Sequence, residues 1–274
     1  MAEPQEPRGR VLVVAGSDSG GGAGIQADIK TITVLGGYAA TAITALTAQN
    51  TVGVFGVLPI DPEFVAEQMA VVLSDIGADA IKTGMLYSEE IIAAVASVLE
   101  FRARHLPVIV DPVMVAKGGT ALLQQRARAA LIERVLPLAA LLTPNAPEAA
   151  VLAGMDVESV TDMERAADRL LAMGASAVLV KGGHLPGDTI VDLLRTADGD
   201  GARFEHPRIA TQATHGTGCT LASAIATGVA HGFTLRDAVA RAEDYVHEAI
   251  RTAPGLGKGC GPLNHGHLIG ARLN

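Results

Sequence analysis

The segment THGTGCT, residues 214–220, contains the residues whose types and spacing are best suited to chemistry. Gly216 and Gly218 flank Thr217, and Cys219 follows at the start of a stretch of small residues with helical spacing. Successive backbone N–H groups at the start of a helix form a site for an anion, where the helix dipole adds about half a positive charge. The segment is therefore predicted to bind a phosphate, or a phosphoryl group during transfer.

Cys219 has three interpretations. In the first turn of a helix the dipole stabilises a thiolate, which predicts a lowered pKa for this cysteine. A second interpretation is a small buried hydrophobe that packs the helix against a sheet, as free cysteines commonly are. A third is a Cys–His hydrolase with His215, which is disfavoured because His215 precedes the glycine turn, where helical spacing does not hold.

A second glycine cluster, Gly20–Gly22 with Gly24, follows the apolar run VLVVAG. Its spacing is G-x-G-x-G, and no acidic residue ends the next apolar run near residues 45–48, so a dinucleotide-binding oxidoreductase is disfavoured. No Lys-Ser or Lys-Thr pair follows the glycines, as a Walker A loop requires. The cluster is either a turn that needs positive φ or a place where a ligand approaches the backbone closely.

The elements that must position these turns follow from an alternation of short apolar runs with amphipathic stretches, which predicts β–α units on a parallel sheet. Helix starts are predicted at Asp61-Pro62, at Ser88, and at a capping box of Thr161 with Glu164. The runs TIVDLLRT and ARFEHPRIAT around DGDG predict an antiparallel hairpin. The fold class is therefore α/β, with a mostly parallel central sheet, helices on both faces and an antiparallel edge hairpin.

Ligands of such sheets bind beyond the carboxyl ends of the strands, where loops from several β–α units meet. The segments SDSGGGAG, TAQNT, KTGML, DPVMVAKGG, TPNAPE and KGGH each accompany the end of an apolar run. They are predicted to form one site. Asp111, inside the apolar VIVDPVM, is costly to place beside a buried strand unless it meets a cation.

Charge and composition narrow the class of partner. A formal net charge of -8 disfavours nucleic acid, and no apolar run approaches the length of a membrane span. Two cysteines are too few for a disulfide framework, which favours a reducing, cytoplasmic location. Residues 1–9 are predicted to be a flexible tail, and residues 10–274 a single domain.

Taken in order, GSDSGGGAGIQADIKT, TALTAQNT, KTGML, DPVM, TPNAPE, VLVKGGH and THGTGCT resemble the hydroxymethylpyrimidine kinase / phosphomethylpyrimidine kinase family of thiamine biosynthesis, in the ribokinase-like superfamily. GKGCGPLNH resembles the family's closing segment, although Cys260 stands where a histidine is expected. The resemblance implies a ribokinase-like fold and ATP-dependent phosphorylation of 4-amino-5-hydroxymethyl-2-methylpyrimidine, and then of its monophosphate.

The resemblance also implies a place for the small substrate at the first glycine turn. The pyrimidine pocket would include Ala23, Gln49, Met85 and Val113, and the Gln49 amide can donate to and accept from the edge of a heterocycle. Asp28 is a weaker candidate for this pocket. Its alternative is a solvated carboxylate on a helix.

The nucleotide phosphates would lie at the second glycine turn. Magnesium would be held by Asp111 and by Glu148 of N-A-P-E, for which the alternative is an ordinary first-turn glutamate. Lys181 would contact phosphates, with a lysine that snorkels into solvent as its alternative. Lys117 would lie in a flap and neutralise the transferring phosphate.

The resemblance places Cys219 where most members of the superfamily carry an aspartate base. Thr217 and Gly216 are expected to contact the nucleotide, and Gly216, Gly218 and Cys219 to form the catalytic segment. Because dissociative phosphoryl transfer asks little of a base, the hypothesis is that backbone N–H groups stabilise the transferring group more than the thiol does.

Three further possibilities stay open from the sequence. A pyridoxal or pyridoxine kinase of the same superfamily would use the same chemistry on another vitamin. A non-catalytic ligand sensor is disfavoured because no DNA-binding module accompanies the domain. Relatives commonly dimerise, so a homodimer is expected.

Overall fold

A computed structural model describes residues 9–115 and 122–270, in which a nine-stranded sheet has the order β3-β2-β1-β4-β5-β6-β7-β8-β9. The strands are β1 (Arg10–Asp18), β2 (Tyr38–Gln49), β3 (Val54–Pro59), β4 (Ala80–Thr83), β5 (Val108–Val110), β6 (Leu141–Leu142), β7 (Ala177–Val180), β8 (Thr189–Thr196) and β9 (Gly201–Pro207). In the spatial order of the sheet, the six strands β2, β1, β4, β5, β6 and β7 each pair in parallel with their neighbours in this group. The predicted mostly parallel sheet is confirmed.

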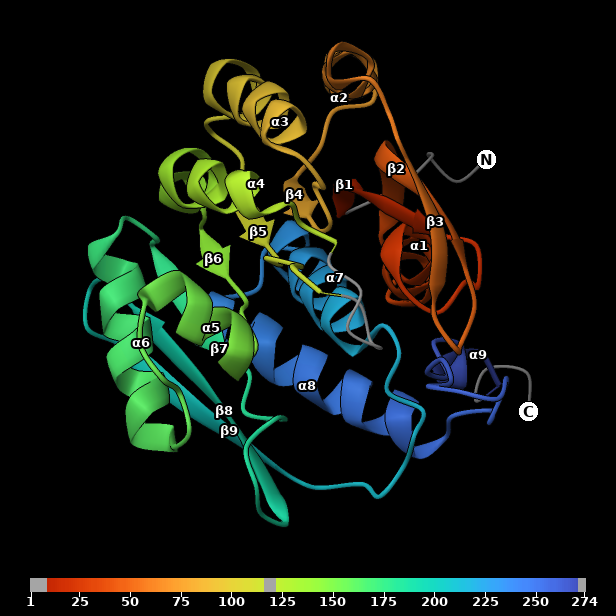
Figure 1. Cartoon of the computed structure of the whole chain (residues 1–274), viewed down its shortest axis with the longest axis vertical. Helices are drawn as coiled ribbons and strands as arrows, with labels where there is room; N and C mark the ends of the chain where they lie inside the picture. The colour runs from red at the N-terminus through yellow and green to blue at the C-terminus, as the bar shows by residue number, and fades with distance from the viewer. Residues whose placement is uncertain (1–8, 116–121, 271–274) are drawn as a thin grey trace, which may run out of the picture.

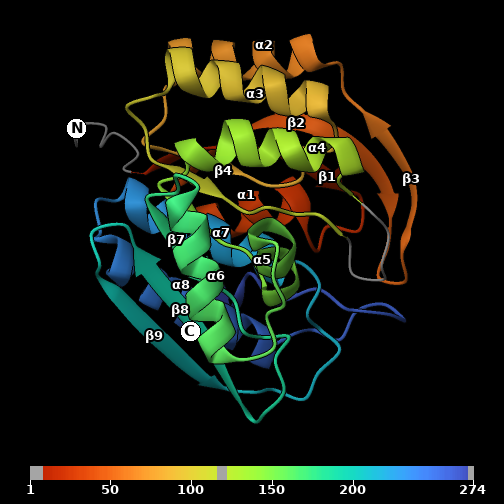
Figure 2. The ribbon, with the colours of Figure 1, turned by 60° about the vertical axis from the view of Figure 1, so that its left-hand side comes forward.

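Helices cover both faces of this sheet (Figure 1). They are α1 (Gly24–Val34), α2 (Pro62–Asp75), α3 (Glu89–Arg102), α4 (Gln125–Ala130), α5 (Ala146–Ala153), α6 (Val160–Ala172), α7 (Thr217–Ala230), α8 (Leu235–Arg251) and α9 (His267–Gly270). Figure 2 shows α2, α3 and α4 on one side of the sheet, with α1, α7 and α8 on the other. In the described ranges, none of these helices is long and apolar enough to cross a bilayer.

The apolar run of β1 shows why the sheet is buried on both faces. Leu12 and Val14 pack in one core cluster, with α2 and α3, whereas Val11 and Val13 pack in the other, with α1 and α7. Side chains alternate across a strand, so a strand covered on both faces must be apolar at every position.

Helix starts agree with the sequence at two of the three predicted places. The side chain of Asp61 accepts hydrogen bonds at the start of α2, and that of Ser88 accepts one at the start of α3. The capping box predicted at Thr161 is wrong. Ser159, two residues earlier, caps α6, and its hydroxyl accepts a hydrogen bond from the N–H of Asp162. Like Thr161, Ser159 has a hydroxyl group and is followed three positions later by an acidic residue, so it satisfies the same capping rule.

Both edges of the sheet are antiparallel. The hairpin of β8 and β9 is confirmed, whereas the pairing of β3 with β2 at the opposite edge was not predicted. Residues 50–53 form a short turn that returns the chain directly, so this connection contains no crossover helix. Gly9, assigned to the tail from the sequence, is buried, and its carbonyl accepts from the N–H of Tyr38.

Candidate active site

The two glycine turns identified in the sequence touch each other. The first links β1 to α1, and the second ends at Gly216, the residue that precedes α7. Gly216 has φ 83, and a Cβ there would overlap the carbonyl oxygen of Gly22. Only glycine fits this contact. Any other residue would have a strained backbone at this positive φ, and its Cβ would collide with the backbone of Gly22. The turn expected to face the small substrate and the turn expected to face phosphate are thus side by side.

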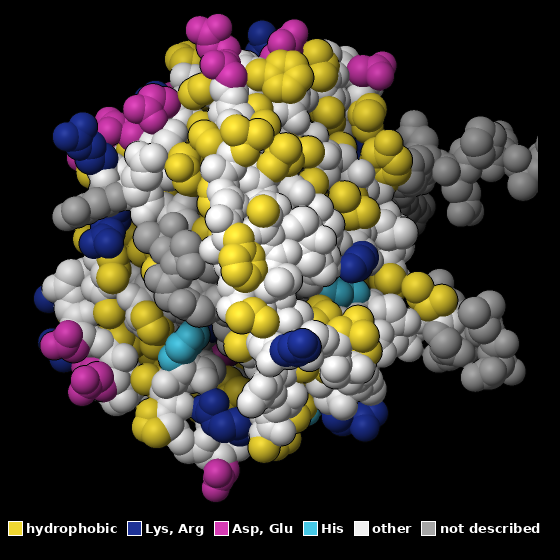
Figure 3. Space-filling view, turned by 45° about the vertical axis from the view of Figure 1, so that its right-hand side comes forward, with side chains coloured by type: hydrophobic (Ala, Val, Ile, Leu, Met, Phe, Trp, Pro, Cys, Tyr) yellow, Lys and Arg dark blue, Asp and Glu magenta, His cyan; other side chains and the backbone are white. Residues whose placement is uncertain are grey.

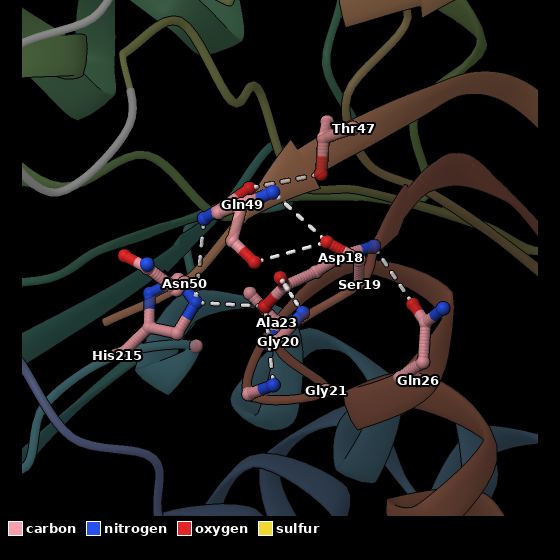
Figure 4. A network of polar contacts seen from close by, with 12 residues as sticks. Asp18, Ser19, Gly20, Gly21, Ala23, Gln26, Thr47, Gln49, Asn50 and His215 are labelled. Atoms are coloured by element: carbon pink, nitrogen blue, oxygen red, sulfur yellow. Dashed lines mark hydrogen bonds and ion pairs between the residues drawn. The ribbon is translucent and has the colours of Figure 1, made fainter. Parts of the chain in front are cut away.

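Asp18 organises the first turn. Its Oδ1 accepts from the N–H of Gly20 at 2.8 Å, and its Oδ2 accepts from the N–H groups of Gly22 and Ala23 at 3.1 and 2.8 Å. The same Oδ2 lies 2.8 Å from Nε2 of His215 (Figure 4). Burial alone would raise the pKa of Asp18, but the bonds from His215 and the backbone hold it below its usual value. A carboxylate therefore ties the turn between β1 and α1 to the loop before α7.

Gln49 lies at the end of β2, beside this network. Its Nε2 is 3.4 Å from Nε2 of His215, and its Oε1 accepts from the hydroxyl of Thr47 at 3.2 Å (Figure 4). An amide has two N–H groups and two lone pairs, so one of each remains for a ligand. Through His215, Gln49 lies on the same side of the molecule as Cys219. The sequence considered His215 only as a partner of Cys219, whereas its ring contacts Asp18 and Gln49.

Met85 and Val113 line the same apolar cluster, although they follow different strands. Tyr87 also packs there and has φ 66, an unusual backbone conformation for a residue other than glycine. The motif KTGML ends at Leu86, directly before Tyr87. The remaining members of the cluster are Ala45, Val54, Val57 and Leu122.

Lys181 and Asp111 form an ion pair opposite the start of α7. Lys181 Nζ lies 3.1 Å from Asp111 Oδ1, and the Lys181 side chain is only 12% exposed, so the alternative of a snorkelling lysine is wrong. A Cβ on Gly218 would lie 3.2 Å from Lys181 Nζ and 3.4 Å from Asp111 Oδ2. The first turn of α7 therefore faces a cation and a carboxylate that arise from two other strands.

Glu148 has two roles in its surroundings. It forms a capping box with Asn145, whose N–H donates to Glu148 Oε2 at 2.8 Å. Burial raises the pKa of Glu148 to about 7; nearby Lys181 opposes this rise and Asp111 adds to it. The structure thus brings Glu148 into the surroundings of the Asp111–Lys181 pair while it also caps α5.

The start of α7 has the backbone geometry expected of an anion site. Gly216 occupies the N-cap position without a side-chain cap, whereas α2, α3 and α5 have one. The hydroxyl of Thr217 donates to the carbonyl of Thr214 at 2.9 Å, and its N–H reaches the same carbonyl at 3.5 Å. Because the first N–H groups of a helix have no partner within it, those of Gly218 and Cys219 are suited to a ligand.

The thiol of Cys219 departs from the expectation of a lowered pKa. Burial, together with the nearby Asp28 and Asp111 carboxylates, raises its pKa to about 12 against the opposing effect of Lys82. The positive field at the start of a helix stabilises a thiolate and lowers its pKa, but the loss of hydration of the thiolate on burial costs more free energy than this field supplies. The expected thiolate is therefore wrong for the free protein, in which Cys219 is a thiol.

Asp28 is neither solvated nor open to a ligand. It is 0% exposed, and its oxygens accept from Lys82 Nζ at 2.9 and 3.1 Å and from the hydroxyl of Ser223 at 2.7 Å. The alternative of a solvated carboxylate is wrong, and a direct pyrimidine contact has no support from this position. Lys82 was missed although it begins KTGML, because a lysine inside a short apolar run gives no sign of its partner. Lys117 lies outside the described residues.

The family profile and the relatives found by sequence agree on one family. The profile of the phosphomethylpyrimidine kinase family matches residues 18–264. The thiamine biosynthesis bifunctional protein ThiED of Geobacter sulfurreducens is 56% identical over 94% of this chain, which spans 52% of that longer protein. The hydroxymethylpyrimidine/phosphomethylpyrimidine kinase of Bacillus subtilis is 47% identical, over 93% of this chain and 94% of its own length.

A solved structure agrees in fold. The crystal structure of an ADP complex of Bacillus subtilis pyridoxal kinase has a TM-score of 0.87 and 36% sequence identity, and the match covers 97% of this chain and 99% of that one. The similarity therefore extends through the whole described sheet and its helices. One of these relatives is a hydroxymethylpyrimidine/phosphomethylpyrimidine kinase and another is a pyridoxal kinase, which are the two activities left open by the sequence.

Proposed function

The chain belongs to the phosphomethylpyrimidine kinase family, and from this premise we propose that it phosphorylates 4-amino-5-hydroxymethyl-2-methylpyrimidine with ATP and then phosphorylates the monophosphate. The hydroxymethyl oxygen forms a bond to the terminal phosphorus, the bond from that phosphorus to ADP breaks, and the hydroxyl proton is released to water. In the second transfer an oxygen of the monophosphate forms a phosphoanhydride bond to the terminal phosphorus of a second ATP, and the bond from that phosphorus to ADP breaks. In this proposal the protein acts in the cytoplasm, where ATP is available.

The observation that supports this proposal best is the contact between the two glycine turns at Gly22 and Gly216. Gln49 lies on one side of it, with a donor and an acceptor suited to an aminopyrimidine edge. Lys181 and the start of α7 lie on the other side, where they suit phosphate. An alcohol and a terminal phosphate bound at these two places would meet near Cys219.

The residues also fit magnesium. Among residues 9–115 and 122–270, no group of three or more His, Cys, Asp or Glu side chains is arranged for a metal ion. Magnesium needs only one or two protein carboxylates when phosphates and water complete its shell, and Asp111 and Glu148 are two such carboxylates. In this proposal the ion would neutralise phosphate charge, while Lys181, Gly216 and Thr217 hold the phosphates.

Cys219 acts in the proposed reaction mainly by position. Because its pKa is about 12, Cys219 is protonated at neutral pH, and little thiolate is present to act as a base. The N–H groups of Gly218 and Cys219 would stabilise the transferring phosphoryl group, as the preorganised donors of other enzymes do for developing charge. Lys117 stays a prediction for neutralising that group.

A pyridoxal kinase is the second candidate, because the crystal structure with TM-score 0.87 is of a pyridoxal kinase. The identity of 47% to a pyrimidine kinase against 36% to that pyridoxal kinase favours the pyrimidine. A coupled assay of ADP release with the pyrimidine alcohol, its monophosphate and pyridoxal tests the proposal. We expect the highest kcat/KM with the two pyrimidines. A large preference for pyridoxal would contradict the proposed substrate. If none of the three compounds caused release of ADP, the proposal of a vitamin kinase would be rejected.

We also propose a homodimer that uses the β3 edge of the sheet. Phe55 and Leu58 of β3 are 72% and 62% exposed, and Phe64 and Val71 of α2 are 54% and 57% exposed. Figure 3 shows hydrophobic side chains gathered on the face of the molecule that includes this edge. An edge strand with exposed apolar side chains readily pairs with another chain. The interface would leave the glycine turns free.

A further inference from the structure

Lys82 is a cation that the proposed reaction does not yet use. It projects from the short strand β4 and is among the largest fully buried side chains of the described chain, at 0% exposure. Its ammonium contacts both carboxylate oxygens of Asp28, on α1, at 2.9 and 3.1 Å. Because neither side chain reaches solvent, the pair cannot contact a nucleotide directly.

The pair is tied to α7, one turn beyond the proposed anion site. The hydroxyl of Ser223 donates to Asp28 Oδ1 at 2.7 Å. Ser223 follows Cys219 by four positions on α7, so the two side chains share one face of that helix. The Lys82–Asp28 pair therefore lies behind the first turn of α7, where it joins α1, β4 and α7.

The ammonium also lies close to the substrate side. A Cβ on Gly84 would be 3.0 Å from Lys82 Nζ, and Gly84 precedes Met85 of the apolar cluster. Figure 1 shows α7 beside β4, the strand that contains Lys82. Lys82 is thus placed between the two parts of the site that must align an alcohol with a phosphate.

Stability alone gives a weak reason for such a pair. Two buried charges lose their hydration, and replacing a buried ion pair by apolar side chains of similar volume is often neutral or stabilising. A buried cation keeps its electrostatic effect on neighbouring groups, because little water screens it. Its first consequence falls on Cys219, whose pKa is lowered by Lys82 and raised by Asp28.

We propose that Lys82 is a positioning residue for phosphoryl transfer: its buried ammonium, held by Asp28 and Ser223, fixes the start of α7 and supplies positive charge behind Cys219. The inference rests on the proposed function, since it assigns a role in that reaction. Lys82 acts through Cys219 and the α7 backbone. It touches neither substrate.

The test measures how fast iodoacetamide alkylates Cys219 in the full-length protein without substrates, by mass spectrometry of the peptide. Cys260, also a free cysteine, is the internal control. We expect Lys82→Met to slow alkylation of Cys219 about 10-fold, because the thiolate loses its cation. Asp28→Asn should accelerate alkylation of Cys219 several-fold, since the positive charge of Lys82 is then unopposed. The double variant, Lys82→Met with Asp28→Asn, should be alkylated at a rate between those of the two single variants.

These signs separate an electrostatic role from a structural one. If the pair only held the helices together, both single variants would loosen α7 and accelerate alkylation, which would overturn the proposal. The double variant contains no unpaired buried charge, so it remains measurable if a single variant fails to fold. As a control, the double variant Arg10→Gln with Asp79→Asn removes a more exposed ion pair, in which Arg10 Nη2 lies 2.8 Å from Asp79 Oδ1. This control should leave the alkylation rate of Cys219 unchanged.

Turnover completes the test. We expect the double variant to lower kcat about 10- to 100-fold while KM for ATP and for the pyrimidine changes less than about threefold. An unchanged kcat would overturn the proposal even if the alkylation rates behaved as expected. If the wild-type protein turned over no pyrimidine, the proposed function would fail, whereas the alkylation rates would still report on Lys82.

Discussion

At Cys219 two effects of opposite sign compete. The start of α7 favours a negative charge, yet burial and two nearby carboxylates raise the pKa of the thiol to about 12. The effect of desolvation on this pKa is larger than that of the helix dipole, because the dipole contributes only about half a charge at the start of the helix. A protonated thiol can position a substrate hydroxyl, so the residue is expected to matter less than the backbone around it.

Replacing Cys219 by alanine should therefore leave much of the activity. We expect kcat to fall less than about 100-fold, the lower limit for losing a general base. The measurement is steady-state turnover of the pyrimidine alcohol from pH 6 to 9, with Cys219→Ser as the conservative variant. A loss of several thousand-fold would instead identify the thiol as the base.

Gly218 gives the complementary prediction. In Gly218→Ala the added Cβ would lie 3.2 Å from Lys181 Nζ, in the space proposed for phosphate, so kcat/KM for ATP should fall about 100-fold. Stability should be equal or slightly higher, since alanine is the better helix former by about 1 kcal/mol. Gly53→Ala, which has nothing within 4 Å of its Cβ, is the matched control. Wild-type kinetics in Gly218→Ala would reject the anion site.

Glu148 predicts a pH dependence of stability. Its pKa rises from 4.5 to about 7 on folding, so between these values the folded protein holds a proton that the unfolded chain lacks. Stability from this group is therefore lost as pH rises through the window, on the order of 3 kcal/mol. Urea unfolding at pH 5, 6, 7 and 8 in EDTA should show a flatter profile for Glu148→Gln than for the wild type. Parallel profiles would contradict the buried position.

At the scale of elements, the ends of separate strands bring the site together. Asp18 ends β1, Gln49 ends β2, and Asp111 and Lys181 directly follow β5 and β7. Each strand pairs in parallel with its neighbour over this part of the sheet, so the carboxyl ends meet at one edge. The β1–α1 turn then depends on a single carboxylate, Asp18.

Removal of Asp18 should separate the β1–α1 turn from the loop before α7. In Asp18→Ala the N–H groups of Gly20, Gly22 and Ala23 lose their acceptor, and we expect KM for the pyrimidine to rise at least about 10-fold. KM for ATP should change little. Asp61→Ala, which removes a helix cap on α2, should cost about 1 kcal/mol in urea unfolding without altering KM. Equal effects of the two variants on KM would contradict the assignment.

At the scale of the whole molecule, the two edges of the sheet differ. The edge at β9 ends a hairpin, whereas the edge at β3 presents exposed apolar side chains beside α2. The proposed site lies at the carboxyl ends of the strands. A dimer through the exposed side chains of β3 would therefore hide apolar surface, next to the cluster that Val54 and Val57 of the same strand share with Met85 and Val113.

The β3 edge predicts a dimer that a single charge disrupts. Phe55, 72% exposed, should lie in the interface, so Phe55→Asp should give a monomer in light scattering after size-exclusion chromatography. Phe101, 84% exposed on α3, is the matched control, and Phe101→Asp should leave the dimer intact. A monomeric wild-type protein would reject the proposal.

Local signals in the sequence were sufficient for most elements. Apolar runs, the caps at Asp61 and Ser88 and the DGDG hairpin depend on neighbours a few residues away, so the chain itself contains the information. The ordered motifs likewise identified the family. The cap of α6 failed because two adjacent segments, at Ser159 and at Thr161, satisfy the same local rule.

Only the tertiary structure decided which partners each side chain meets. Asp28 reaches Lys82 from 54 positions away, and His215 reaches Asp18 from 197, distances over which no spacing rule applies. The same holds for the pKa of Cys219, which depends on how much water the surrounding helices exclude. Residue types specify what chemistry is available, but burial and charge are sums over neighbours that exist only once the chain has folded.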